Sequence, residues 1–310
     1  MPKMKILSLF MCSLFFAAIA AFPTYSADST AVPITTVVTV LGQKGAPPPP
    51  IAQEDVNVYS GKSKLAVISW TPARDTRADL QLAILINSAD GSAAIGSELR
   101  ELADFIQSQP KTTAVGLFYA ASGTVQTASP FSTDHDAVAK TLHLTLGWRN
   151  ANSPSIYLSL SSLIKKWPAP ASRREVLLIA SGFDPLYPGL DDPYLQSAIN
   201  NAQKAGILVH TLYSGGARLG QSFRGDIAQN NLSQLSSQTG GADLYLGILG
   251  PVSFGPYLQN LDGLLSNQYS LTFSAPASRR RKGEFRAIQV RLEEHNVKFL
   301  YPRQVFVPGP

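Results

Sequence analysis

The run Arg173-Arg174-Glu175-Val176-Leu177-Leu178-Ile179-Ala180-Ser181-Gly182-Phe183-Asp184 decides the fold. Its apolar centre is typical of a buried strand, and the strand ends in a turn of small residues. A helical pattern then covers 194–204, and a second apolar strand follows at 205–212. Two buried strands joined by a helix form a βαβ unit, so this stretch predicts a parallel sheet with helices packed against it.

The same alternation of strands and helices surrounds this unit. Further strands are expected at 80–86, 113–120, 123–128 and 242–246, and helices at 95–106, 134–144, 156–167, 231–238 and 254–266. Repeated alternation of this kind is typical of a doubly wound, mostly parallel sheet with helices on both faces. We therefore predict an α/β domain over residues 77–267.

The segments on either side of this domain have a different pattern. Residues 34–76 and 268–308 contain β-branched and alternating runs with polar turns, and neither segment shows a helical period. Each segment alone would leave exposed strand edges and a thin core. We predict that the two segments pair into a small antiparallel β-sandwich into which the α/β domain is inserted.

The first residues are typical of a secretory signal. Lys3 and Lys5 precede an apolar run over 6–21, which is shorter than a membrane span requires. We expect a signal peptide at 1–27 and a mobile lead at 28–33, and the alternative is a permanent N-terminal anchor. Removal of the signal would leave no stable membrane span and no cysteine, since the only one is Cys12. The expected location is periplasmic, cell-surface or extracellular.

The charge pattern argues against a nucleic-acid partner. The formal net charge is +5, and four basic residues stand together at Arg279-Arg280-Arg281-Lys282. Aromatic residues do not alternate with basic ones, as a nucleic-acid surface would require. We interpret the basic run as a solvated hairpin tip, with a patch for an anionic partner as the alternative.

Several phrases of the chain carry a resemblance to a known fold. They are the run at 173–182, Gln203-Lys204-Ala205-Gly206-Ile207, Phe131-Ser132-Thr133-Asp134-His135 and Asn267-Gln268-Tyr269-Ser270-Leu271. With the order of elements, they resemble a von Willebrand factor type A domain, and more narrowly the exported bacterial VWFA-related family described from acidobacteria. The resemblance spans residues 34–308.

That resemblance implies a metal-ion-dependent adhesion site at the carboxyl ends of the parallel strands. The family holds Mg²⁺ or Mn²⁺ through an Asp-x-Ser-x-Ser loop, a Thr on a second loop and an Asp on a third, and an acidic group of the partner completes the site. The matching positions in this chain are Asn87, Ala89, Gly91, Pro154 and Ser181. Hard divalent cations need anionic oxygen ligands, so the replaced residues predict a vestigial site without a cofactor.

A displaced metal site is the first alternative. Asp90, Ser92, Ser155 and Asp184 lie in the same loops and supply oxygens that suit Mg²⁺ or Mn²⁺. The competing interpretation is that Asp90 and Asp184 belong to ordinary turns.

A serine hydrolase that uses Ser181 is the second alternative. Ile179 and Phe183 stand where the nucleophile elbow needs glycines, and no histidine has a supporting spacing. Asp134-His135-Asp136 is better explained as the cap of a helix than as a ligand set. We therefore expect a protein that is not an enzyme.

The sequence as a whole predicts an exported, non-enzymatic protein-binding or adhesion-type module. The expected partner is another protein, bound by loops at 87–96, 148–155, 181–193 and 214–225. Tyr187, Tyr194 and Phe223 are the candidate contact residues, and simple loop packing is the alternative for all three.

Overall fold

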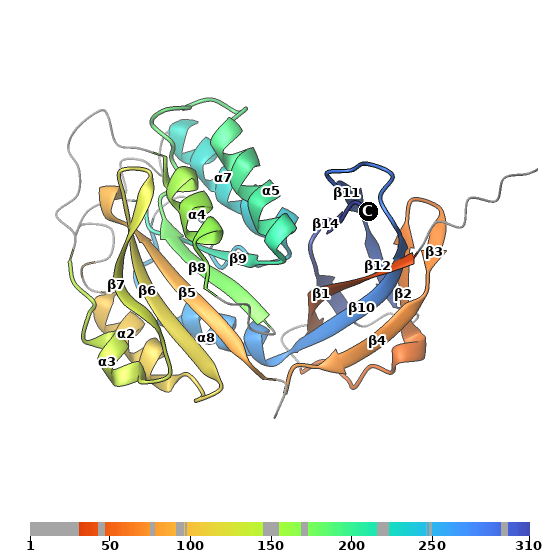
Figure 1. Ribbon diagram of the computed structural model, residues 1–310. Coiled ribbons are helices and arrows are strands. Elements are labelled where there is room, and N and C mark those ends of the chain that lie inside the picture. The colour runs from red at the N-terminus through yellow and green to blue at the C-terminus, as the bar shows by residue number, and fades with distance from the viewer. Residues whose placement is uncertain are drawn as a thin grey trace, which may run out of the picture.

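Figure 1 shows a computed structural model of the chain, in which an α/β sheet with helices stands beside a group of antiparallel strands. The structure describes residues 31–42, 47–74, 78–90, 96, 98–144, 155–168, 173–215, 223–245, 247, 250–292 and 297–310. The expected signal peptide at 1–27 lies outside these residues. Among the helices described, none is long and apolar enough to cross a membrane.

The central sheet has five strands in the order β7-β6-β5-β8-β9. Their bounds are β5 (Leu80–Asn87), β6 (Thr113–Ala121), β7 (Thr124–Ser132), β8 (Arg173–Ala180) and β9 (Leu208–Tyr213). β5 is parallel to both β6 and β8, β8 is parallel to β9, and only β7 runs antiparallel to its neighbour. The predicted mostly parallel sheet is thereby confirmed.

Helices cover both faces of this sheet, because the side chains of each buried strand alternate between two cores (Figure 1). Leu82, Ile84 and Ile86 of β5 pack in one core, and Ala83 and Leu85 pack in the other. The first face carries α2 (Leu99–Ser108), α3 (His135–Ala139) and α8 (Gly255–Ser266); the second carries α4 (Ile156–Lys165), α5 (Pro193–Ala205) and α7 (Phe223–Thr239). The sheet is doubly wound, as the sequence predicted.

Strands from both ends of the chain form the antiparallel part. One sheet has the order β13-β1-β10-β4, a second β12-β2-β3 and a third β11-β14. The bounds are β1 (Ala31–Gly42), β2 (Val56–Ser60), β3 (Ser63–Leu65), β4 (Val67–Pro72), β10 (Gln268–Pro276), β11 (Glu284–Ala287), β12 (Gln289–Leu292), β13 (Val297–Leu300) and β14 (Gln304–Val307), with a short 3-10 turn η2 (Gln53–Asp55). The sheets share one core, in which Trp70 stacks on Tyr269 at 4.4 Å between ring centroids.

Several elements differ from the expectation. The strand predicted at 242–246 was wrong: the described part of that segment contributes one isolated bridge, Thr211 to Asp243, beside β9. The helix predicted at 231–238 begins earlier, at Phe223, and the helix predicted at 134–144 is the short α3. β1 begins at Ala31, so its first residues fall in the segment expected to be a mobile lead.

Candidate functional site

The carboxyl edge of the central sheet has a switch point between β5 and β8. From β5 the chain continues to β6 and β7 on one side, and from β8 it continues to β9 on the other side. Loops that leave neighbouring strands in opposite directions open a crevice, where open α/β sheets place their ligands. Asn87 ends β5 and Ser181 follows β8, so both lie at this point.

A carboxylate from the first loop fills this point. Asp90 lies in the 3-10 turn η4 (Ser88–Asp90), directly after β5. Its Oδ2 accepts a hydrogen bond from the Ser181 backbone N–H at 2.7 Å, and its Oδ1 accepts one from the Ser181 hydroxyl at 2.8 Å. The side chains of Asn87 and Ser214 lie near it and favour its ionised form. The aspartate therefore binds Ser181, one of the positions at which the sequence resemblance implied a metal ligand.

Both oxygens of Asp90 are engaged by Ser181. Burial raises the pKa of Asp90 to about 6 from its ordinary 3.8, although the surrounding hydrogen-bond donors act to lower it. The cost of removing the charge from water thus exceeds the stabilisation that the donors give to the ionised form.

Two further aspartates, Asp184 and Asp192, lie between β8 and α5. Asp184 is 1% exposed, and its Oδ1 accepts from the Leu186 N–H at 2.8 Å. Asp192 caps α5, and its Oδ1 accepts from the N–H groups of Tyr194 and Leu195 at 2.8 and 3.1 Å. The Oδ2 atom of each aspartate is buried without a donor in the described part of the chain.

These two carboxyl groups are neighbours and interact. Burial is the main reason that the pKa of Asp192 rises to about 6, and the charge of Asp184 adds to the rise. Two nearby carboxylates repel one another, so protonation of one of them relieves the repulsion.

Tyr157 lies under this loop and fixes its start. Its hydroxyl donates to the Gly182 carbonyl oxygen at 2.8 Å. Burial, followed by the charges of Asp192 and Asp184, raises the pKa of Tyr157 well above its usual value. Gly182 has φ +76°, and a Cβ there would lie 2.4 Å from the Ala228 carbonyl oxygen. Only glycine fits between this loop and α7.

The structure brings together some of the residues singled out in the sequence. Asn87, Asp90 and Ser181 meet, whereas Asp184 faces Asp192 instead. Ser155 caps α4, since its hydroxyl accepts from the Tyr157 N–H at 3.2 Å. Ala89 lies within η4. Gly91, Ser92 and Pro154 lie outside the described residues.

Two of the predicted contact residues, Tyr187 and Phe223, carry exposed rings at the carboxyl edge of the sheet. Phe223, at the start of α7, is 73% exposed, and Tyr187 is 41% exposed. Leu186 and Leu190 are exposed in the same loop as Tyr187. Tyr187 and Tyr194 pack edge to face at 5.3 Å between ring centroids. Tyr187 and Tyr194 thus pack on one another within the loop, while Phe223 is the most exposed of the three.

Sequence reasoning missed Asp192 and Ser214. The signal for Asp192 was present, because an aspartate before a proline is a frequent helix start. No local pattern indicates Ser214, since it reaches Asp90 only through the packing of β9 beside β8.

No protein-family description matches the sequence, and no curated protein matches it. Solved structures do resemble the chain. An aerotolerance-related membrane protein from Bacteroides fragilis with multiple mutations to serines is 12% identical, with a TM-score of 0.44 over 60% of this chain and 98% of that one. Three N-terminal domains of the type V pili tip protein Mfa5 from Porphyromonas gingivalis are 10% identical, with a TM-score of 0.42 over 89% of this chain and 66% of that one.

The VWA domain of SpRpn10 is 13% identical, with a TM-score of 0.35 over 60% of this chain and 91% of that one. At such identities and TM-scores the likenesses say nothing about what this chain binds. The strand order defines the class, a doubly wound α/β domain joined to antiparallel sheets built from both ends of the chain, and these solved structures are what its fold is similar to.

Proposed function

We propose that the loops at the carboxyl edge form a binding face for another protein, and that this face works without a metal ion. The observation that carries the proposal is the buried position of Asp90, whose two oxygens both accept hydrogen bonds from Ser181. A divalent cation would have to displace these donors, and the neighbouring Asn87 and Ser181 offer only neutral oxygens.

Exposed apolar side chains on these loops support a protein as the partner. Leu186, Tyr187, Leu190 and Phe223 all present large apolar surfaces to solvent. The loop after β8 and the start of α7 touch one another, since the Arg224 guanidinium lies 5.7 Å from the centre of the Phe183 ring. Aromatic anchors within a rim of polar residues are typical of the centres of protein interfaces.

The same geometry supports a role other than catalysis. Ser181 is 4% exposed, and its hydroxyl donates to Asp90 rather than to a histidine. His210 is fully buried within β9 and its Nε2 bonds to Glu175. Together with the signal-like start of the chain, these features favour an exported adhesion-type module.

A thermal melt tests the metal-free part of the proposal. We expect the same unfolding midpoint in EDTA and in millimolar Mg²⁺, Mn²⁺ or Ca²⁺. A cation bound only to the native state at 100 times its dissociation constant would add about 2.7 kcal/mol and raise the midpoint by a few degrees. Such a rise, abolished by Asp90→Ala or Asp184→Ala, would establish the displaced site of Asp90, Ser92, Ser155 and Asp184 instead.

A capture experiment tests the binding face. The protein is immobilised and exposed to the exported fraction of its source organism, and bound proteins are quantified by mass spectrometry. We expect Phe223→Asp to remove specifically bound proteins, and EDTA to leave them in place. Ile68→Asp is the matched control, because Ile68 is also exposed and apolar but lies on β4. Equal losses in both variants would refute a dedicated face at the carboxyl edge.

A further inference from the structure

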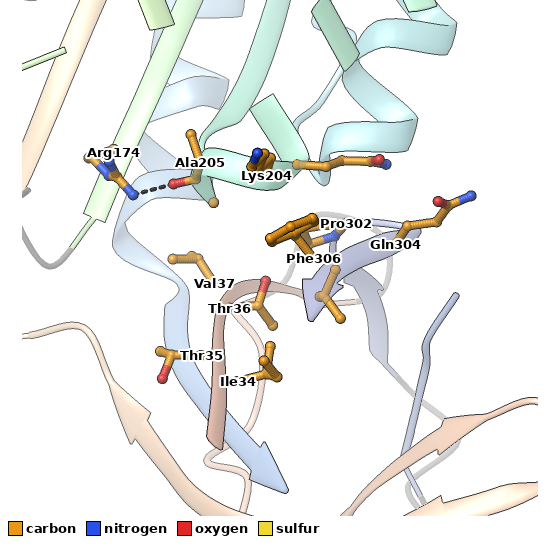
Figure 2. A pocket seen from close by; sticks show the side chains of 13 residues that line it. Ile34, Thr35, Thr36, Val37, Arg174, Lys204, Ala205, Pro302, Gln304 and Phe306 are labelled. Atoms are coloured by element: carbon orange, nitrogen blue, oxygen red, sulfur yellow. Dashed lines mark hydrogen bonds between the residues drawn. The ribbon is translucent and has the colours of Figure 1, made fainter. Parts of the chain in front are cut away.

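A second candidate surface lies at the opposite edge of the central sheet, where the antiparallel strands meet it. A cavity of about 260 Å³ opens between β1, the end of α5 and β14. Figure 2 shows this cavity with Thr35 and Val37 of β1 on one side, Arg174 and Ala205 above, and Lys204 over Phe306. We refer to it as the β1 groove.

One wall of the β1 groove is an unpaired strand edge. Along β1 the backbone groups of successive residues point to opposite sides. The Val40 N–H bonds to the Asn267 carbonyl oxygen, so the backbone N–H and C=O groups of even-numbered residues point toward β10. The backbone groups of odd-numbered residues point to the opposite edge, where β13 pairs only with Thr39–Gly42 of β1. The N–H and C=O groups of Thr35 and Val37 therefore face the groove without a strand partner in the described chain.

A proline explains why β13 stops short. In the register that pairs Leu300 with Thr39, residue 302 would stand opposite Val37. That residue is Pro302, which has no N–H to continue the ladder. The chain instead turns away, and the Arg303 N–H bonds to the Gln238 carbonyl oxygen at the end of α7. Pro302 is therefore the reason that this part of the β1 edge stays unpaired by β13.

The other walls of the β1 groove carry positive charge. Arg174 is half-buried and donates one hydrogen bond, to the Ala205 carbonyl oxygen, although a guanidinium has five N–H donors. The Lys204 ammonium lies 4.9 Å from the centre of the Phe306 ring. None of the residues that line the groove is an aspartate or a glutamate. Neither cation has an ion-pair partner in the described part of the chain.

We propose that the β1 groove binds an extended segment of a partner protein that pairs with the free edge of β1 and places an acidic side chain between Arg174 and Lys204. Addition of a strand to an open sheet edge supplies main-chain hydrogen bonds that do not depend on sequence. The two cations supply charge complementarity, which selects an acidic segment over a neutral or basic one. The open stretch of β1 has room for about three to five residues of such a segment, at about 3.3 Å per residue.

A displayed library of random nine-residue peptides tests the proposal, since it assumes no particular partner. Selection is made on the purified protein. We expect enriched peptides to alternate β-branched residues with polar ones and to carry at least one Asp or Glu. No enrichment over an uncoated surface, or enrichment of basic peptides, would overturn the proposal.

A selected peptide is then titrated against variants by fluorescence anisotropy. Lys204→Glu is expected to weaken binding tenfold or more, because it replaces an attractive charge with a repulsive one. Lys165→Glu is the matched control: both lysines are exposed in the last turn of a helix, so both changes disturb the helix dipole equally. Equal weakening by the two variants would show that net charge, and not the groove, attracts the peptide.

The strand pairing has its own test. Val37→Pro removes an N–H that points into the groove and leaves the β10 ladder intact, so a folded variant should lose binding. Should this variant fail to fold, N-methylation of alternate peptide nitrogens tests the same hydrogen bonds on wild-type protein, and undiminished binding would refute the pairing.

Phe223→Asp should leave peptide binding unchanged, which separates this surface from the carboxyl-edge face. A dimer in sedimentation that Lys204→Glu dissociates would assign the groove to a second copy of the chain and overturn the proposal.

Discussion

At the scale of single residues, the contact between Asp90 and Ser181 shows where sequence reasoning stops. The vestigial metal site was inferred from the residues at the positions that the resemblance implied, and it stays a prediction. The partner of Asp90 could not be predicted, because the two residues are 91 positions apart and meet only through the pairing of β5 with β8. A loop pattern indicates that a polar residue is present, but tertiary packing decides which atoms it reaches.

Asp90 also makes the stability of the protein depend on pH. Its folded pKa of about 6 lies above its ordinary 3.8, so the fold favours the protonated form. The stability contribution is complete below about pH 4 and is lost as the pH rises through about 6. Asp90→Asn cannot ionise. We expect the unfolding free energy of wild type, relative to this variant, to fall by at most about 3 kcal/mol between pH 4 and pH 7.

Urea denaturation at a series of pH values measures this difference. Asp191→Asn is the control, because Asp191 is exposed and its replacement removes one negative charge from a nearby loop. Parallel stability profiles for wild type and Asp90→Asn would contradict the assignment of the raised pKa to Asp90.

At the scale of elements, the most accurate predictions were those for the segments with the clearest apolar pattern. The apolar runs of β5 and β8 are buried on both faces and were predicted within a residue or two. The predicted strand at 242–246 was wrong because its apolar residues pack against the sheet while its backbone makes only one bridge. The first half of α7 was missed because Gly225 and several amides interrupt its apolar pattern, although Ile227, Ala228 and Leu232 bury one face.

The start of α5 carries a prediction of its own. Asp192 caps this helix with Oδ1, its Oδ2 is buried without a donor in the described residues, and its carboxyl group interacts with that of Asp184. Asp192→Asn keeps the capping oxygen and replaces the repulsive oxygen with an N–H donor. At pH 8 we expect this variant to be more stable than wild type. Asp192→Ala should be less stable by about 1 kcal/mol, because it loses the cap.

The pair of variants is compared by denaturant unfolding at pH 8 and at pH 4.5. The advantage of Asn should shrink at the lower pH, where the Asp192 carboxyl group of the wild type is protonated. An advantage that is the same at both values would mean that repulsion between Asp184 and Asp192 is not its cause.

At the scale of the whole molecule, a buried polar chain joins the two parts. Arg173 donates to Gln268 Oε1 at 2.6 Å, and Gln268 in turn donates to Glu175 Oε2 and to Thr39 Oγ1, each at 3.2 Å. His210 Nε2 lies 2.7 Å from the same Glu175 oxygen. Arg173, Glu175 and His210 belong to the central sheet, while Gln268 and Thr39 belong to β10 and β1. The connection therefore crosses from one core to the other.

The backbone N–H of Ala242 fixes the direction of the hydrogen bond between His210 and Glu175. His210 Nδ1 accepts from the Ala242 N–H at 3.1 Å, so the ring proton is on Nε2 and is donated to Glu175. Burial lowers the pKa of Arg173, and the charge of Glu175 acts in the opposite direction. The charge of Glu175 thus helps the buried guanidinium to stay ionised, and removal of this carboxylate takes away the larger of the two charges, Glu175 and Asp79, that act in this direction.

Glu175→Gln should for this reason destabilise the protein by roughly 3 kcal/mol, the usual effect of breaking one side of a buried charge pair. Arg280→Gln, which breaks an exposed pair with Glu284 at 3.9 Å, should cost less than about 1 kcal/mol. In a double-mutant cycle, Arg173→Met combined with Glu175→Gln should cost clearly less than the sum of the two single changes. Additive costs would show that the two residues act independently.

Calorimetry of Glu175→Gln tests whether the polar chain couples the two parts of the molecule. Because the polar chain spans both cores, its loss should separate a single unfolding transition into two, one for each part.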